Sequence, residues 1–441
     1  MVQPAHAAGP KTGRIAGRLH KAMVAVNFGE VLDTAPPGTA EPRIATMEGE
    51  RAAAQPNLVE AKPIHQQPQV DATVIELDAR GRPIASGTVL MSPKYKDGVK
   101  VPVDKNFHTS AVRYRLWDNT EWYGHNGQGT VDTVPGRENA PIDYMSPYPA
   151  SIIKLMVGFG LLQLVDKGAV KLDDTYAYEP ASSSARCGGA TTRTIRDYFD
   201  RMITISDNGA TCSLIKVLHE HDAVDGLNQT FHDIGLETLQ LKGTNPGNGD
   251  WSPYVTMSSL DTAKLLALVN GVPGTAWTAP DGTPVTSGLL SGSARAFFLK
   301  ELGEQAWNNV LSTTNYCGYD YPTQGIAQLT PQRWIGPDGT VTIDDDPDGK
   351  YDHGVQPCQE AAQVTFAHKT GLTDTAAGDA GIVKSLPGKA RRSYIIVAFS
   401  NLGWRYIDPN RPTNPPVRPA VNRTEKFAEL GRAMDAYEAR R

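Results

Sequence analysis

Hydrophobic and polar positions along the chain alternate between the spacing of strands and the spacing of helices. Near the start, residues 73–77 and 83–85 flank a turn at Asp78-Ala79-Arg80-Gly81, which predicts a pair of strands. Two further buried strands are predicted near the end, at residues 381–383 and 393–399. Helical spacing recurs at residues 151–167, 193–203, 210–219, 260–269, 293–302 and 425–440. This order predicts an α+β fold, in which an antiparallel sheet is flanked by terminal helices and an all-helical lobe is inserted, with the active site between them.

The same pattern predicts how the chain is organised. Residues 1–66 carry scattered Pro and Ala, so we expect an N-terminal extension ahead of one domain at residues 67–441. Within that domain we expect the helical lobe at about residues 150–305 and an irregular polar insert at about residues 308–365. A polar stretch from Val112 to Tyr123, with Asp118-Asn119 at its centre, predicts one more hairpin.

Composition and charge exclude two classes of protein. The 441 residues are 21% charged and 40% hydrophobic, which is typical of a globular protein. The net charge of −5 provides no basic face that could follow a phosphate backbone, so we do not expect a nucleic-acid binder. No run approaches the roughly 18 apolar residues that a membrane span requires.

The N-terminus and the cysteines bear on the compartment. Ala5-His6-Ala7 has the small-x-small pattern of a secretory cleavage site, so we predict a secreted or periplasmic protein whose signal peptide was trimmed. The alternative is an ordinary Ala-rich terminus. The four cysteines, Cys187, Cys212, Cys317 and Cys358, lack metal-binding spacing, and both two disulfides and four free thiols remain open.

The first candidate for chemistry is a serine and a lysine at the start of the most apolar predicted helix. Ser151 and Lys154 are three residues apart, so their side chains share one helix face. A serine hydroxyl needs a neighbouring base to become a nucleophile, and a lysine buried in an apolar helix can lose its proton and act as that base. The pattern alone is weak, because Ser213 and Lys216 form a second copy.

Two further polar segments follow in the chain. Ser206-Asp207-Asn208 lies at a bend between two predicted helices, where an ordinary helix N-cap is the alternative interpretation. Lys369-Thr370-Gly371 follows apolar residues and precedes the two late strands, which is typical of an edge strand whose Lys and Thr bind an anionic group. Lys11-Thr12-Gly13 repeats the second motif, but it precedes any predicted strand.

Together, in this order, the three segments resemble the serine β-lactamase and penicillin-binding protein superfamily, most closely its class A β-lactamase-like branch. The resemblance covers roughly residues 72–441 and implies no cofactor and no bound metal. It implies that Ser151 is the acylated nucleophile and Lys154 its base, and that Ser206 relays a proton to the leaving nitrogen. The other implied roles are binding of the substrate amide and of the lysine by Asn208, and binding of the substrate carboxylate by Lys369 and Thr370. Gly371 belongs to the same substrate-binding segment and permits close backbone approach, and the backbone N–H groups of Ser151 and Leu372 form an oxyanion hole.

The chain departs from class A at the residue that activates the deacylating water. That class carries a glutamate there, whereas residues 239–251 contain no glutamate, and Asp250 is the acid nearest in sequence that could replace it. We therefore expect an acyl-enzyme on an amide or β-lactam carbonyl, from a small-molecule or peptide substrate with a carboxylate, without assuming fast hydrolysis. The alternatives are a D-alanyl peptidase, amidase or esterase, and a catalytically weak penicillin-binding domain.

One acidic segment has the spacing of a calcium loop. Asp344, Asp346, Asp348 and Asp352 occupy positions 1, 3, 5 and 9 of an EF-hand-like pattern, with Gly349 at position 6. Position 12 is Val355 rather than glutamate. We interpret the segment as a solvated acidic turn, with calcium binding as the alternative.

Overall fold

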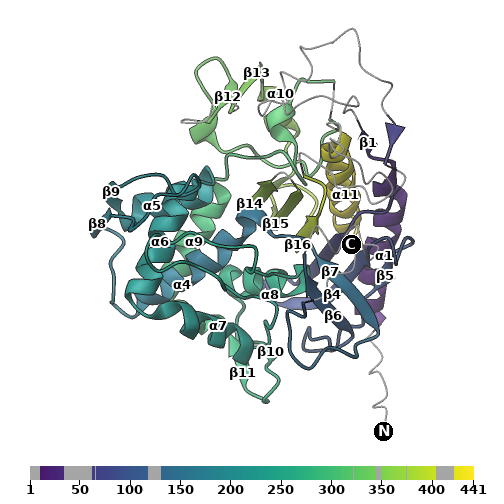
Figure 1. Cartoon of the computed structure of the whole chain (residues 1–441). Coiled ribbons are helices and arrows are strands. Elements are labelled where there is room, and N and C mark those ends of the chain that lie inside the picture. Colours follow the sequence, from purple (N-terminus) through teal and green to yellow (C-terminus); the bar gives the residue numbers. More distant parts are fainter. Residues whose placement is uncertain are drawn as a thin grey trace.

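The computed structural model describes residues 10–33, 62–64, 66–117, 131–320, 322–343, 349–373, 375–403 and 422–441. Its centre is a six-stranded antiparallel sheet with the order β14-β15-β16-β3-β4-β5 (Figure 1). The strands are β3 (Val70–Leu77), β4 (Pro83–Met91), β5 (Val99–Lys100), β14 (Val364–Thr373), β15 (Ala376–Ser385) and β16 (Ser393–Ser400). Every residue of β3 is buried, as expected for a strand that is covered on both faces.

Helices cover both faces of the sheet. On one face, α1 (Pro10–Val26) packs against β4 and against α11 (Asn422–Glu438). Gly87 of β4 permits this approach, because a Cβ there would lie 2.5 Å from the Ala16 backbone nitrogen. On the other face, α8 (Ser259–Asn270) packs against β3, β15 and β16. The α+β class with an antiparallel sheet and terminal helices is confirmed.

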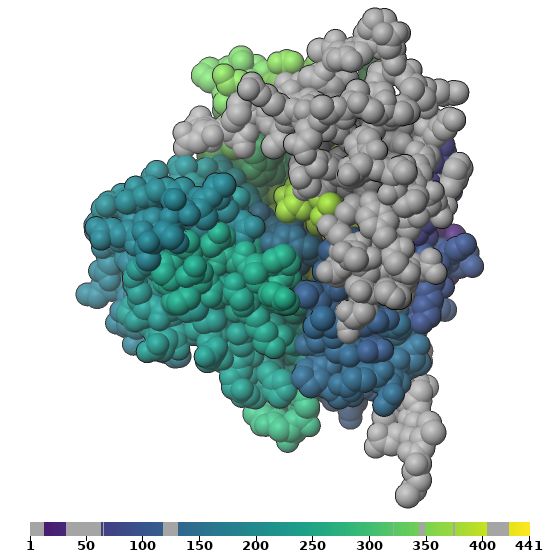
Figure 2. All heavy atoms as spheres, viewed as in Figure 1, coloured from purple at the N-terminus to yellow at the C-terminus, as the bar shows by residue number. Residues whose placement is uncertain are grey.

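The remaining helices form a lobe beside the sheet, seen in teal on the left of Figures 1 and 2. They are α4 (Lys154–Asp166), α5 (Ile195–Thr204), α6 (Asn208–Glu220), α7 (Ala223–Asp233) and α9 (Gly292–Gly303). Helix α4 is the centre of this lobe, because it packs against α5, α6, α7 and α9 and nearly all of its residues are buried. Such burial explains why its sequence is apolar all round rather than amphipathic.

Shorter elements complete the described chain. The two-stranded sheets pair β1 (Leu32–Asp33) with β2 (Lys62–Pro63), β6 (Val112–Leu116) with β7 (Ile142–Ser146), β8 (Thr175–Tyr178) with β9 (Thr191–Thr194), β10 (Thr275–Thr278) with β11 (Pro284–Thr286), and β12 (Thr340–Thr342) with β13 (Lys350–Gly354). The short helices are η1 (Phe28–Glu30), η2 (Ala150–Ile153), η3 (Ser287–Leu289), η4 (Thr314–Tyr316), η5 (Gln332–Trp334) and α10 (Gln356–Ala361). Disulfides join Cys187 to Cys212 and Cys317 to Cys358, which resolves the alternative that the sequence left open.

Strand β6 pairs in parallel with β7, and Arg115 of β6 also forms an antiparallel bridge with Asp132. The turn and the return strand of the hairpin predicted from Val112 to Tyr123 lie at residues 118–123, outside the described chain. The structure differs from the sequence predictions in two places. Helix α7 was not predicted. The segment at Ser151 begins as the 3₁₀ turn η2 before α4. No helix among the described residues is long and apolar enough to cross a membrane.

Candidate active site

Ser151 lies in η2, immediately before the buried helix α4. The residue before it, Ala150, has a φ of 50°, a left-handed conformation that is uncommon for a residue with a side chain. Such backbone strain is often found at functional sites, where the surrounding structure holds it in place. The Ser151 side chain remains partly exposed, although the three residues that follow it are buried. Ser151 is thus less buried than the start of the helix that follows it.

Lys154 is fully buried, and its amine contacts four polar atoms. Its Nζ lies 2.9 Å from Ser151 Oγ, 3.0 Å from Ser206 Oγ, 2.5 Å from the Ser206 carbonyl oxygen and 2.8 Å from Asn208 Oδ1. Burial lowers the pKa of Lys154 well below its usual range, and the charge of Lys369 lowers it further. The predicted pair of Ser151 and Lys154 is thus in direct contact.

Ser206 and Asn208 come from the bend between α5 and α6. Asp207 between them caps α6, because its carboxylate accepts a hydrogen bond from the Ala210 N–H at 2.9 Å and pairs with Arg201 at 3.0 Å. The flanking residues are then free to turn toward Lys154. Ser206 has a φ of 65°, so a second left-handed residue contributes to this cluster. The N-cap interpretation therefore holds for Asp207, while its neighbours belong to the site.

Lys369 reaches the same cluster from β14, the edge strand of the sheet. Its Nζ donates hydrogen bonds to Ser206 Oγ and to the Thr370 carbonyl oxygen, both at 2.9 Å. The ammonium is fully buried, and burial lowers its pKa to about 7, although Asp379 partly offsets this effect. Ser206 Oγ thus lies between the two lysines, in contact with both.

The backbone after Lys369 runs directly past η2. A Cβ at Gly371 would lie 2.8 Å from the Pro149 carbonyl oxygen and 3.1 Å from the Ala150 Cβ, so only glycine allows this approach. Thr370 is also buried here, while Leu372 is partly buried. The structure therefore brings the Lys-Thr-Gly segment and the turn that carries Ser151 side by side.

Sequence reasoning missed a buried polar network behind Lys369. The ring of His368 bridges Asp379 Oδ1 at 2.8 Å and Asn308 Oδ1 at 2.9 Å, and it stacks on Phe366 with a centroid distance of 4.1 Å. Both His368 and Asp379 are completely buried. This network joins the strand that carries Lys369 to the start of the insert. The only sequence signal was the histidine directly before the motif.

Asp250 is held by an arginine. Its Oδ1 accepts a hydrogen bond from Arg186 Nη1 at 2.8 Å and another from its neighbour's backbone N–H at 2.8 Å. Arg186 also donates to the Trp251 carbonyl oxygen and lies 4.5 Å from the Trp251 ring centroid. No hydrogen bond or ion pair described for this part of the chain joins Asp250 to Ser151 or Lys154.

Among the described residues, one group of possible metal-ligating side chains comes together. It consists of Cys187, Cys212 and Asp250, but the two cysteines form a disulfide and therefore lack thiolates. Of the acidic segment with calcium-loop spacing, Asp344, Asp346 and Asp348 lie outside the described residues. Asp352 is an exposed residue of β13.

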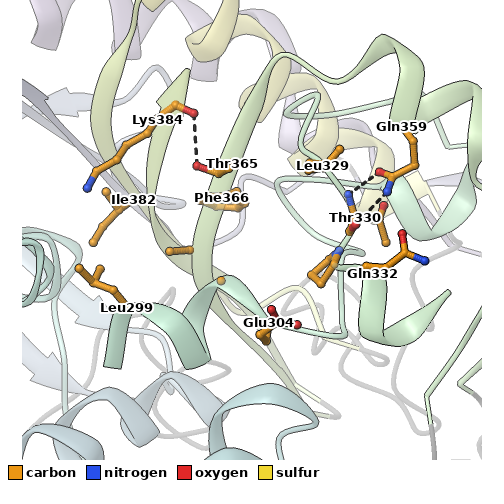
Figure 3. A pocket seen from close by; sticks show the side chains of 13 residues that line it. Leu299, Glu304, Leu329, Thr330, Gln332, Gln359, Thr365, Phe366, Ile382 and Lys384 are labelled. Atoms are coloured by element: carbon orange, nitrogen blue, oxygen red, sulfur yellow. Dashed lines mark hydrogen bonds between the residues drawn. The ribbon is translucent and has the colours of Figure 1, made fainter. Parts of the chain in front are cut away.

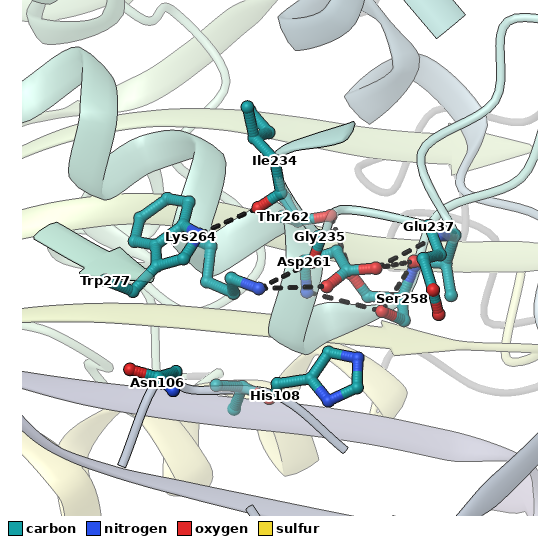
Figure 4. Close-up of polar contacts among 12 residues, drawn as sticks. Asn106, His108, Ile234, Gly235, Glu237, Ser258, Asp261, Thr262, Lys264 and Trp277 are labelled. Carbon is teal, nitrogen blue, oxygen red and sulfur yellow. Dashed lines mark hydrogen bonds and ion pairs between the residues drawn. The ribbon is translucent and has the colours of Figure 1, made fainter. Parts of the chain in front are cut away.

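A third buried lysine shows that burial alone does not define the site. Lys264 of α8 donates to the Gly235 carbonyl oxygen at 2.6 Å and lies 3.9 Å from Asp261 and 5.0 Å from the Trp277 ring centroid (Figure 4). Its surroundings supply a carboxylate and an aromatic face, but no hydroxyl within hydrogen-bonding distance among the described contacts. Lys154 differs because it is aimed at serine hydroxyls.

Comparisons with known proteins complete this picture. Residues 143–310, which include the Ser151 and Ser206 segments, match the model of the beta-lactamase enzyme family. No curated protein matches the chain. Similar solved structures include a beta-lactamase from Chitinophaga pinensis, with 21% identity, 66% of this chain and 85% of that chain covered, and a TM-score of 0.39. PBP-A has 17% identity, with 92% and 98% covered and a TM-score of 0.43. The TLA-1 extended spectrum beta-lactamase has 14% identity, with 89% and 97% covered and a TM-score of 0.43.

Proposed function

We propose that this chain, whose residues 143–310 match the beta-lactamase enzyme family, is a member of the serine β-lactamase and penicillin-binding protein superfamily and forms an acyl-enzyme at Ser151 on an amide or β-lactam carbonyl. The observation that carries the proposal is the set of contacts around the Lys154 amine. Two of its four neighbours, the Ser206 carbonyl oxygen and Asn208 Oδ1, can only accept hydrogen bonds. A neutral amine has two N–H groups, and these two acceptors use both of them.

The lone pair of the amine then faces the serine hydroxyls. Because Ser151 Oγ lies 2.9 Å away, its O–H can donate to Lys154 Nζ, which is the arrangement a general base requires. As Oγ attacks the carbonyl carbon, its proton passes to Lys154, and the lowered pKa of that lysine keeps the amine free to receive it. The developing oxyanion would accept hydrogen bonds from the backbone N–H groups of Ser151 and Leu372.

Ser206 would complete acylation. Its Oγ is within hydrogen-bonding distance of both Lys154 and Lys369, so it can pass the proton from Lys154 to the leaving nitrogen. Lys369 and Thr370 would bind the substrate carboxylate, while Asn208 would hold the substrate amide and Gly371 would allow the strand to approach. These roles define a substrate with an acyl group, a leaving nitrogen and a carboxylate.

Hydrolysis of the acyl-enzyme is expected to be slow. Asp250 is the carboxylate proposed as the base, and hydrogen bonds from Arg186 and from the Trp251 backbone N–H already occupy its Oδ1. We therefore favour a β-lactamase-like enzyme with a long-lived acyl-enzyme. This observation also favours the second candidate, a catalytically weak penicillin-binding domain or a peptidase that passes its acyl group to an amine.

Intact-protein mass spectrometry with penicillin G tests the proposal. The wild-type chain should gain the mass of one penicillin, Ser151→Ala should gain none, and Lys154→Met should react roughly 10²–10⁴-fold more slowly. The second Ser-x-x-Lys pair supplies matched controls, because Ser213→Ala and Lys216→Met change the same residue types outside the site. Labelling of Ser151→Ala, or wild-type rates in Lys154→Met, would contradict the proposal.

A further inference from the structure

A cavity lies beside the edge strand β14, at the opposite end of that strand from Gly371. It has a volume of about 520 Å³, which is within the usual range for sites that bind small molecules. Its lining residues come from α9, from the start of β14, from the end of β15 and from the insert, as Figure 3 shows. None of the residues that we place at the Ser151 site lines it.

One wall of this cavity is apolar. Leu299, Phe366, Ala367 and Ile382 form it, and Leu329 on the insert adds a side chain that is 42% exposed. Leu329 is one of four large hydrophobic residues that are exposed in the described part of the chain. Exposed apolar surface inside a concave site favours binding of an apolar group.

Two opposite charges line the same cavity. Lys384 is exposed and Glu304 is partly exposed, and neither the ammonium nor the carboxylate forms a hydrogen bond or ion pair with another described residue, although the charge of Glu304 acts on Arg333. The apolar surroundings lower the pKa of Lys384. Thr330 also lines the cavity, and its hydroxyl is buried without a hydrogen-bond partner, although the Thr330 backbone pairs with Gln359. Buried polar groups usually have partners, so the Thr330 hydroxyl is suited to a ligand, and the two exposed charges are accessible to the same ligand.

We propose that this cavity binds a small zwitterion with an apolar side chain, such as an α-amino acid or a short peptide with free termini. Lys384 would pair with the ligand carboxylate, Glu304 with its amine, and the apolar wall would cover its side chain. A ligand with one charge would leave the other protein charge unpaired. This inference does not depend on acylation at Ser151.

Isothermal titration calorimetry with L-phenylalanine tests the inference on the full chain. 3-Phenylpropionate and phenethylamine keep the ring and remove the amine or the carboxylate, so each should bind about tenfold more weakly, the usual contribution of one charge-assisted hydrogen bond. Lys384→Met and Glu304→Gln should each weaken phenylalanine binding by a similar factor. Lys389→Met, an exposed lysine outside the cavity, should leave it unchanged.

The most discriminating measurement combines each protein variant with the ligand that lacks the corresponding charge. In Lys384→Met, removal of the ligand carboxylate should cost nothing further, so phenethylamine and phenylalanine should bind equally. In Glu304→Gln, the same equality should hold for 3-phenylpropionate. Absence of saturable binding, or wild-type affinity for phenylalanine in Lys384→Met, would overturn the inference. The titration should give the same result in Ser151→Ala, so its failure is separable from a failure of the acylation proposal.

Discussion

Replacing Lys369 by methionine should stabilise the folded chain and change how its stability depends on pH. Lysine has an ordinary pKa of 10.5 in the unfolded chain, whereas burial lowers the pKa of Lys369 to about 7 in the folded chain. Below pH 7 folding must therefore bury an ammonium, and near pH 7 it must in part release a proton. Both processes cost free energy. Methionine has a similar length and removes the cost.

The size and sign of the effect follow from these two pKa values. The unfolded chain binds the proton more tightly, so the wild-type free energy of unfolding rises with pH between about 7 and 10.5. The cost of Lys369 is about 4 kcal/mol at pH 7 and falls to about 2 kcal/mol at pH 9. Methionine also loses the hydrogen bonds to Ser206 and Thr370, which offsets about 1–2 kcal/mol. Lys369→Met should thus exceed the wild type by about 2–3 kcal/mol at pH 7 and nearly equal it at pH 9.

Urea unfolding of both proteins at pH 7, 8 and 9 measures this difference. Lys389→Met, at an exposed position, serves as the control and should track the wild type at every pH. A difference between Lys369→Met and the wild type that does not change with pH would refute the reasoning, because it would mean that Lys369 keeps its ordinary pKa when folded.

Three further predictions concern stability and are measured by denaturant unfolding. Burial raises the pKa of Asp71 to about 6, so the wild-type free energy of unfolding should fall by up to about 3 kcal/mol as the pH rises from 4 to 6. Asp71→Asn should remove that fall. If the free energies of unfolding of variant and wild type changed with pH in the same way, this prediction would be contradicted. His368→Leu should cost about 3–5 kcal/mol because it leaves the buried Asp379 carboxylate without its partner, and adding Asp379→Asn should recover part of the loss, whereas additive losses would argue against the pairing. Replacing Cys317 and Cys358 by alanine should cost about 2–4 kcal/mol, and an unchanged midpoint would show that the disulfide does not stabilise the insert.

The fold was largely predictable because its pattern is local. The buried strands near both ends of the chain, the apolar helix after Ser151 and the closing helix at residues 422–438 each carry their own periodicity. The pairing of strands distant in sequence was not predictable. Nothing in the sequence of β6 indicates that it pairs with β7 in parallel, because turn signals concern only the adjacent chain.

The site was predictable in its residue types but not in its geometry. Ser213 and Lys216 repeat the spacing of Ser151 and Lys154, yet Ser213 Oγ donates to the Gly209 carbonyl oxygen and Lys216 pairs with Glu220 within α6. Only tertiary packing separates the two pairs. Likewise, the left-handed backbone at Ala150 and Ser206 is imposed by contacts distant in sequence, so no local pattern could indicate it.

The absent deacylation glutamate shows that a residue can have the right type and sequence position without being available for a catalytic role. The sequence offered Asp250 as a replacement because it is an acid at about the right place. In the structure that carboxylate already serves as the partner of Arg186. Hydrogen bonds from Arg186 and from the Trp251 backbone N–H occupy its Oδ1, so that oxygen is not free to bind a water molecule as a base would. A long-lived acyl-enzyme is therefore what the contact between Arg186 and Asp250 leads us to expect.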